Sequence, residues 1–280
     1  TADLSTSRIP DHPGVEVLLT SANFEVREGS TTFRTDRSST AVADAWVRAI
    51  EGATESIHIA SGHLRLRPVA EALIARRQAD PDLDIRVYLD QQEFISASGD
   101  QAQAQAVEEC LAEASTDLQR WNCQNKSFLW GRQVGEAGVD VRYKAYSYRW
   151  DHSYAVQMHH KYMVIDGDEL LTGSYNLSIN AEHATFENSL HLTGPEHAGL
   201  IAAYEGNFEA IWQTGRAEGL LDDLRDEIAT AEVIPLVFEP MALTWDEYSA
   251  LRGLIMDECP QVSSEEFRRD PAGHRTCPRP

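Results

Sequence analysis

Lysine is nearly missing from this chain of 280 residues, and long apolar runs are missing altogether. The lysines are Lys126, Lys144 and Lys161, so arginine carries almost all of the positive charge. No apolar stretch approaches the roughly 18 to 20 residues that a membrane-spanning helix needs, so we expect no transmembrane segment. Internal repeats and low-complexity tracts are also missing. The composition, 42% hydrophobic and 25% charged, is that of a globular protein and excludes a disordered or fibrous one.

The four cysteines lack the CxxC spacing and the neighbouring histidines of a zinc site, so we expect no metal site. Their even number, and a start at Thr1 without a basic and apolar leader, are typical of a processed, exported protein. We therefore predict a secreted or periplasmic location, with the signal peptide removed. Of three possible connectivities we favour Cys110–Cys123 with Cys259–Cys277; four buried free thiols are the alternative.

Acidic residues far outnumber basic ones, 45 against 24, which gives a net charge of −21. Such a chain repels a polyanion at long range, which argues against sequence-independent binding of nucleic acid. The segment 141–163 differs, because it is locally basic and dense in aromatic residues. These could line a groove for bases or the rim of a lipid pocket, or they could pack as strand residues on a core. They are Tyr143, Tyr146, Tyr148, Trp150, Tyr154 and Tyr162.

Strand and helix patterns alternate along most of the chain and predict an α/β fold, with a mixed or parallel central sheet flanked by helices. Period-two patterns predict strands at 14–19, 55–60, 84–89, 139–143, 162–166, 170–172 and 189–192. Helical spacing predicts helices at 42–50, 68–78, 102–118 and 196–212, and 120–136 is expected to be a loop.

Three regions are expected along the chain. Residues 1–13, polar and containing proline, are predicted to form an extended arm, and residues 14–213 the main α/β domain. The remaining residues, 214–280, are too few for a stable independent core and are predicted to form a small α/β appendage. Its expected elements are helices at 220–230 and 244–256 and a strand at 234–238.

The most informative stretch is a predicted strand-turn-strand hairpin at 158–172 with polar groups at its ends. In an extended segment residues two apart share a face, so His159 and Lys161 are expected to project together. Ser174 and Asn176, also two apart, would add a hydroxyl and an amide at the end of the next strand. A cation, a hydroxyl and an amide together suit the oxygens of a phosphoryl group.

The complete spacing, HxK, four residues, Asp, six residues and GSxN, resembles the motif of the phospholipase D superfamily. The residues that carry the resemblance are His159, Lys161, Asp166, Gly173, Ser174 and Asn176. Glu187 stands where the superfamily places a carboxylate that bonds the catalytic histidine. The strand-helix-strand opening at 45–90 is also similar to the start of that domain, which makes the expected fold a phospholipase D-like one.

The resemblance implies a phosphodiester hydrolase without metal or cofactor, in which one histidine attacks phosphorus and a second protonates the leaving oxygen. Water then resolves the phosphohistidine. By this resemblance His159, Lys161 and Glu187 are catalytic, and Lys161, Ser174 and Asn176 bind phosphate. Asp166 and Gly173 are expected to be structural: the aspartate fixes a turn, and the glycine allows a close approach of the backbone.

Two histidines are needed, and the chain contains one copy of the motif. Lys126 and Lys144 have no histidine two residues before them, and His63 has no lysine two residues after it. We therefore predict a homodimer in which His159 of both chains meets in a shared active site. An alternative is a partner histidine from the same chain, for which the candidates are His152, His160 and His183.

Three hypotheses about function follow from these observations. The overall acidity, the expected export and the aromatic surroundings favour a phospholipid and hence lipid degradation. Small single-motif members of the superfamily that act as dimers include nonspecific nucleases, which makes DNA or RNA the alternative. A non-catalytic binding protein on the same fold is the third hypothesis, but such a protein would be expected to have a broken motif, and this motif is intact.

Overall fold

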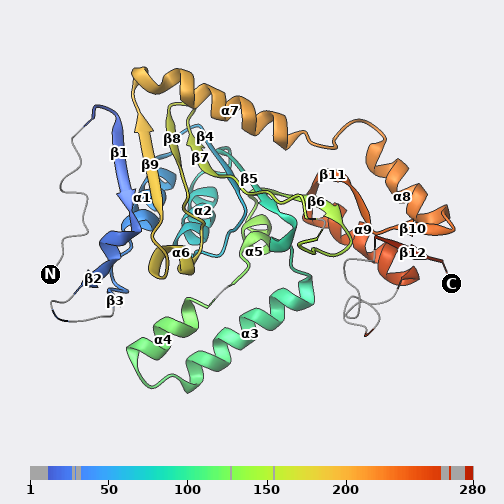
Figure 1. The fold of residues 1–280 in the computed structure, drawn as a ribbon, viewed down its shortest axis with the longest axis horizontal. Coiled ribbons are helices and arrows are strands. Elements are labelled where there is room, and N and C mark those ends of the chain that lie inside the picture. The colour runs from blue at the N-terminus through green and yellow to red at the C-terminus, as the bar shows by residue number, and fades with distance from the viewer. Residues whose placement is uncertain are drawn as a thin grey trace.

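The computed structural model describes residues 12–26, 29, 33–126, 128–153, 155–259, 265 and 275–279. Nearly all of the expected N-terminal arm, 1–13, lies outside these residues. At the centre is an eight-stranded mixed sheet with the strand order β1-β9-β8-β7-β4-β5-β6-β11 (Figure 1). Its strands are β1 (Val15–Leu19), β4 (Ser56–Ser61), β5 (Asp84–Asp90), β6 (Asp140–Ser147), β7 (Lys161–Ile165), β8 (Glu169–Gly173), β9 (Asn188–Thr193) and β11 (Val237–Thr244).

Helices cover both faces of this sheet, because its central strands are apolar on both faces. Ile57 and Ile59 of β4 join one core cluster with the helices of the first face, and Ala60 joins a second cluster beneath α7. The mixed α/β sheet flanked by helices is therefore confirmed. The helices are α1 (Ala41–Gly52), α2 (Arg67–Ala79), α5 (Gly131–Glu136) and α6 (Ile179–His183) on the first face and α7 (Ala198–Trp212) on the second.

The strand order brings the two halves of the chain together at the middle of the sheet. β4 pairs with β5 in parallel, as the strand-helix-strand pattern predicts, and with β7 antiparallel. In that antiparallel pair Ser61 lies opposite Lys161. The segment after β4 and the segment before β7 therefore emerge side by side at one edge of the sheet.

The prediction of a loop at 120–136 is wrong, because this stretch contains part of α4 (Asp117–Gln124) and all of α5. Thr116 and Gln119 form a capping box that starts α4, a helix of 8 residues, too short to show helical periodicity. It packs against α3 (Ala97–Glu113) as a hairpin that projects from the body of the molecule (Figure 1). The predicted bond Cys110–Cys123 joins these two helices, with the Cα atoms 5.6 Å apart.

The last residues of the chain extend the sheet as well as packing beside it. Strand β11 pairs antiparallel with β6, so what the sequence suggested as one short strand at 234–238 is β10 (Val233–Pro235) and a longer edge strand. A register shift between Val237 and Met241 interrupts the pairing and hides the strand period. The second predicted bond, Cys259–Cys277, is present too. The other elements here are α8 (Leu220–Thr230), α9 (Trp245–Glu258) and β12 (Thr276–Pro278).

Two short strands near the N-terminus, β2 (Phe24–Val26) and β3 (Phe33–Thr35), form a separate hairpin that the sequence did not predict. Within the described part of the chain, no helix has the length and apolar character needed to cross a membrane.

Candidate active site

The expected pair of His159 and Lys161 lies where the chain enters β7. Lys161 is the first residue of the strand, and its Nζ lies 3.3 Å from Nδ1 of His159 and 3.0 Å from the backbone oxygen of the same residue. The imidazole of His159 is exposed. The structure thus holds a nucleophilic ring beside a fixed positive charge, at a surface that a substrate can reach.

A buried carboxylate that the sequence analysis missed fixes the chain just before this pair. Oδ2 of Asp90, at the end of β5, accepts the backbone N–H of Met158 at 2.7 Å. Burial raises the pKa of Asp90, while hydrogen bonds from backbone N–H groups act in the opposite direction. Its position at the end of a predicted parallel strand, where functional side chains gather in open α/β sheets, was the available signal.

Ser174 and Glu187 are also brought together, because Ser174 directly follows β8, Glu187 directly precedes β9, and these two strands are neighbours in the sheet. The hydroxyl of Ser174 donates to Oε2 of Glu187 at 2.5 Å and accepts the N–H of Asn188 at 3.1 Å. The resemblance led us to expect the carboxylate of Glu187 beside His159, whereas the bonds it accepts here come from Ser174 and, at 2.9 Å, from Thr185. Burial lowers the pKa of Lys161 and the charge of Glu187 opposes that shift, so the two groups lie within electrostatic range.

Gly173 and Asp166 occupy positions that agree with structural roles. A Cβ on Gly173 would lie 2.3 Å from the backbone oxygen of Asn188, so only glycine allows β8 and β9 to approach here. Asp166 lies at the far end of β7 from His159 and has a φ of 51°. Its carboxylate accepts the backbone N–H groups of the turn before β4, from Thr54, Glu55 and Ser56.

The three alternative histidines of the same chain differ in exposure and in position. His152 is exposed and adjoins Asp151, with the nearest nitrogen and oxygen 3.7 Å apart. His160 is exposed and lies between His159 and Lys161, and His183 is buried at the far end of the cavity described below. His63, for which the sequence offered no lysine partner, lines the same cavity as Asn176 of the motif.

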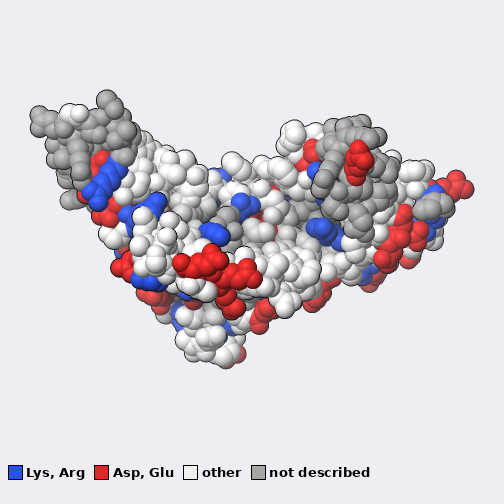
Figure 2. Space-filling view, turned by 90° about the horizontal axis from the view of Figure 1, so that it is seen from below, with Lys and Arg blue, Asp and Glu red and all other residues white. Residues whose placement is uncertain are grey.

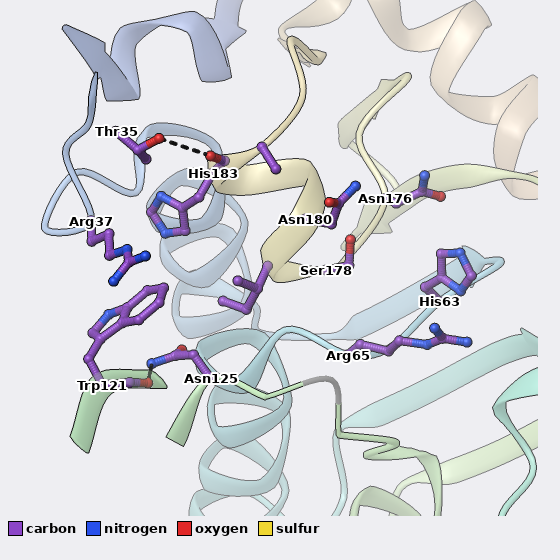
Figure 3. A pocket seen from close by; sticks show the side chains of 12 residues that line it. Thr35, Arg37, His63, Arg65, Trp121, Asn125, Asn176, Ser178, Asn180 and His183 are labelled. Carbon is purple, nitrogen blue, oxygen red and sulfur yellow. Dashed lines mark hydrogen bonds between the residues drawn. The ribbon is translucent and has the colours of Figure 1, made fainter. Parts of the chain in front are cut away.

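A cavity of about 540 Å³ extends from the motif toward α4 (Figure 3). Its described lining contains no carboxylate, although the chain has 45 acidic residues. At the far end Arg37 lies over the ring of Trp121, 5.0 Å from the centroid. Such a cavity is suited to an anionic, polar ligand. The described lining residues are Thr35, Arg37, His63, Arg65, Trp121, Asn125, Asn176, Ser178, Ile179, Asn180, His183 and Ala184.

The aromatic segment 141–163 does not line this cavity. Its tyrosines at 143, 146, 148 and 162 are buried in the core, so their interpretation as a base-binding groove or lipid rim is wrong. Tyr143, Tyr148 and Tyr162 belong to three different core clusters, because helices cover both faces of the sheet and rings on either face are buried. Trp150 is half-buried, and Tyr154 lies outside the described residues. The aromatic side chain of the cavity is Trp121, from the stretch expected to be a loop.

Among the described residues, one group has atoms close enough to hold a metal ion, on the opposite side of β4 from α1 and α2. His58, Glu205 and Glu209 lie with their ligand atoms within 4.8 Å of one another. Both ring nitrogens of His58 already bond carboxylates, Glu205 at 2.6 Å and Asp84 at 3.1 Å, and Arg86 pairs with Glu209 at 2.7 Å. This group is a hydrogen-bonded network separate from the motif, and its described contacts already occupy both ring nitrogens of His58.

We expect the pKa of His159 to lie below its usual 6.5, chiefly because of the neighbouring ammonium of Lys161, then because of burial and the charge of His63. The imidazole is then neutral and able to attack at pH 7, and it gains a proton only as the pH falls through this lowered value. An NMR titration of the ring protons measures this pKa directly. The Lys161→Met variant should move it upward, whereas an unchanged pKa would contradict the electrostatic coupling.

Comparisons with known proteins give a family match and several similar relatives. The family described as "Cardiolipin synthase, PLD-like domain" matches residues 46–212. The mitochondrial cardiolipin hydrolase of Danio rerio is 33% identical over 86 residues, which are 30% of this chain and 34% of that protein. The enzyme of the same name from Chlamydomonas reinhardtii is 41% identical over 58 residues, 21% of this chain and 25% of the relative. The chain thus spans about a third or less of the length of these relatives.

Two solved structures are similar at low identity. Nuc from Salmonella typhimurium, described as a phospholipase D family member, is 15% identical with a TM-score of 0.43, over 71% of this chain and 93% of that one. NucT from Helicobacter pylori is 15% identical with a TM-score of 0.40, over 70% of this chain and 94% of that one.

Proposed function

Because the chain belongs to the phospholipase D-like family, whose domain matches residues 46–212, we propose that it cleaves phosphodiesters without metal through a phosphohistidine at His159. The observation that carries this proposal is the exposed imidazole of His159, with the ammonium of Lys161 at 3.3 Å. A neutral ring nitrogen attacks phosphorus, and the leaving oxygen departs with a proton from an acid. Water then attacks the phosphohistidine and releases His159.

Lys161, Ser174 and Asn176 are proposed to stabilise the phosphoryl oxygens in the transition state. Removing a well-placed donor of this kind typically costs about 3 to 4 kcal/mol of activation free energy. Oδ1 of Asn176 is buried without a hydrogen-bond partner among the described residues, which leaves its amide free to turn toward a ligand. Glu187, bonded to Ser174, is proposed to hold that hydroxyl in place and to balance the charge of Lys161.

We propose a phospholipid as the substrate. Two observations support this choice: the relatives described above are named cardiolipin hydrolases, and the chain has a net charge of −21. On the face seen in Figure 2, the described Lys and Arg side chains occur as isolated groups beside clustered acidic ones. A long polyanion needs a continuous basic track, whereas the head group of a single lipid needs only the local positive charge of the site.

Cleavage of nucleic acid is the second candidate, and the cavity beside Asn176 favours it. Trp121 offers a ring for stacking, Arg37 a cation and Asn125 an amide, which together can hold a nucleotide next to the scissile phosphate. A short single strand would fit this local site better than a duplex would.

The assembly that we propose is a homodimer with a shared active site, as the single copy of the motif implies. The exposed position of His159 leaves room for a second copy of the same segment across a twofold axis. Two disulfides favour an oxidising compartment, and we propose a secreted or periplasmic location.

One assay separates the substrates. In EDTA, the parent protein is offered phosphatidylcholine vesicles, cardiolipin vesicles and single-stranded DNA, together with the Lys161→Met variant. We expect release of the lipid head group and a loss of about 10²- to 10³-fold in the variant. Lys126→Met, which changes an exposed lysine outside the motif, is the matched control and should keep the parental rate.

Cleavage of DNA with the lipids left intact would establish the second candidate. A parent protein that cleaves none of the three substrates in EDTA would contradict the proposed chemistry.

A further inference from the structure

A second histidine of this chain is bonded to a buried carboxylate beside the motif. Nδ1 of His63 lies 3.0 Å from Oε1 of Glu93, a side chain that is 1% exposed. The same carboxylate accepts the backbone N–H of Leu64 at 3.1 Å and Nε of Arg65 at 2.8 Å. His63 lies outside the sequence motif, because no lysine follows it at the right spacing. A histidine oriented by a carboxylate, however, is the arrangement that acid–base catalysis uses.

The charge of Glu93 determines which nitrogen of His63 faces the substrate. Burial raises the pKa of Glu93, but the hydrogen bonds from His63 and Arg65 outweigh burial and hold it below its usual range. An ionised carboxylate can only accept, so Nδ1 of His63 carries the proton of their bond. Nε2 is then the nitrogen left for the substrate: it can take a proton when the ring is neutral and give one when the ring is protonated.

The backbone places His63 next to the nucleophile. The N–H of Gly62 donates to the backbone oxygen of His160 at 3.2 Å, which continues the pairing of β4 with β7. A Cβ on Gly62 would lie 3.9 Å from the Cα of His159, and the charge of His63 acts on the imidazole of His159. Figure 3 shows His63 and Asn176 at the same end of the cavity.

The main chain around His63 is fixed, so the ring is positioned before substrate arrives. The hydroxyl of the fully buried Ser61 donates to the backbone oxygen of His63 at 2.7 Å and accepts its N–H at 3.2 Å. The side chain of His63 is 23% exposed, which leaves one side of the ring open to the cavity. The contacts on both its ring and its backbone hold His63 in one orientation.

We infer that His63, oriented by Glu93, is the acid and base of this active site, a role for which the family motif implies the partner's histidine. This inference rests on the proposed function. As His159 forms its bond to phosphorus, the bond from phosphorus to the leaving oxygen breaks, and that oxygen takes the proton from Nε2 of protonated His63. In the second step Nε2 takes a proton from the attacking water, the bond from phosphorus to His159 breaks, and both rings return to their starting states.

The leaving group tests this role. A nitrophenolate leaves without a proton, whereas an alkoxide needs one, so an acid matters only for the second kind of ester. The His63→Gln variant should lose about 10²- to 10⁴-fold with an alkyl leaving group and less than about 10-fold in the first turnover of a nitrophenyl phosphodiester. The variant should then accumulate the phosphohistidine, because no base remains to take the proton of the attacking water. One equivalent of nitrophenolate per active site should therefore appear as a burst.

Controls separate this inference from the proposed function. His160→Ala, an exposed neighbour outside the acid–base pair, should match the parent with both esters. His159→Ala should show neither turnover nor burst; a burst from that variant would contradict the proposed function itself. Equal losses of His63→Gln with both esters would mean a structural role, and unchanged rates would assign the proton to another group, such as the partner's His159. Either result overturns the inference about His63.

Discussion

Replacing His159 by alanine is expected to lower phosphodiester turnover by about 10⁴-fold or more, because the variant lacks the atom that bonds to phosphorus. The fold should persist, since the ring is exposed and the described bond of its side chain is the one from Lys161. The free energy of unfolding should therefore change by less than about 0.5 kcal/mol. The measurement pairs steady-state turnover in EDTA with a denaturant titration of both proteins.

Covalent chemistry gives this prediction a second readout. Parent protein quenched during turnover of a phosphodiester labelled on the part that stays bound should carry an acid-labile, base-stable label on one histidine. The label should be missing from His159→Ala and present in His160→Ala, which changes the adjacent exposed ring. Substantial turnover without His159, or a label on another residue, would show that the motif histidine is not the nucleophile.

Replacing Asp166 by alanine is expected to lower the free energy of unfolding by about 2 to 3 kcal/mol, because several donors lose one charged acceptor. The carboxylate accepts the backbone N–H groups of Thr54, Glu55 and Ser56 and the hydroxyl of Thr54, at distances of 2.7 to 2.8 Å. These bonds tie the turn before β4 to the end of β7. The matched control is Asp168→Ala, an exposed carboxylate on the same turn, which should cost less than about 0.5 kcal/mol.

The pH dependence of this effect has a definite sign. Burial raises the pKa of Asp166, but the hydrogen bonds from the turn outweigh it and hold the pKa below the ordinary 3.8. The stabilisation is therefore present above about pH 4 and is lost as the pH falls through the lowered pKa. Denaturation curves of parent and Asp166→Ala should converge at acid pH. A difference in stability that persists below pH 2 would contradict this account.

Activity separates the roles of the two ends of β7. Five residues of strand, Lys161–Ile165, stand between His159 and Asp166, so the aspartate cannot reach a phosphate bound at the histidine. Asp166→Ala should therefore keep most of the parental turnover per folded molecule under stabilising conditions. A loss as large as that of His159→Ala, in a protein shown to be folded, would place Asp166 in the chemistry.

Local sequence patterns determined much of the fold. Alternating residues such as Ile57 and Ile59 mark β4 as a strand, and the strand-helix-strand order makes its pairing with β5 parallel. The motif spacing brought His159 and Lys161 together because residues two apart in an extended segment share a face. The disulfides also followed from sequence-local cysteines. Each of these properties depends on neighbours a few residues away, or on spacings along the chain.

Only the tertiary structure decided what surrounds the motif. The bond between His63 and Glu93 joins residues 30 apart, and the cavity combines Arg37, Trp121 and Asn176 from elements far apart in the chain. A two-residue period shows that Tyr143 lies on the same face of its strand as the residues two positions away. It does not show whether that face packs against a helix or meets a substrate. The sequence alone therefore determined the fold class and the candidate nucleophile, whereas packing between distant segments decided the shape, the charge and the acid–base partner of the site.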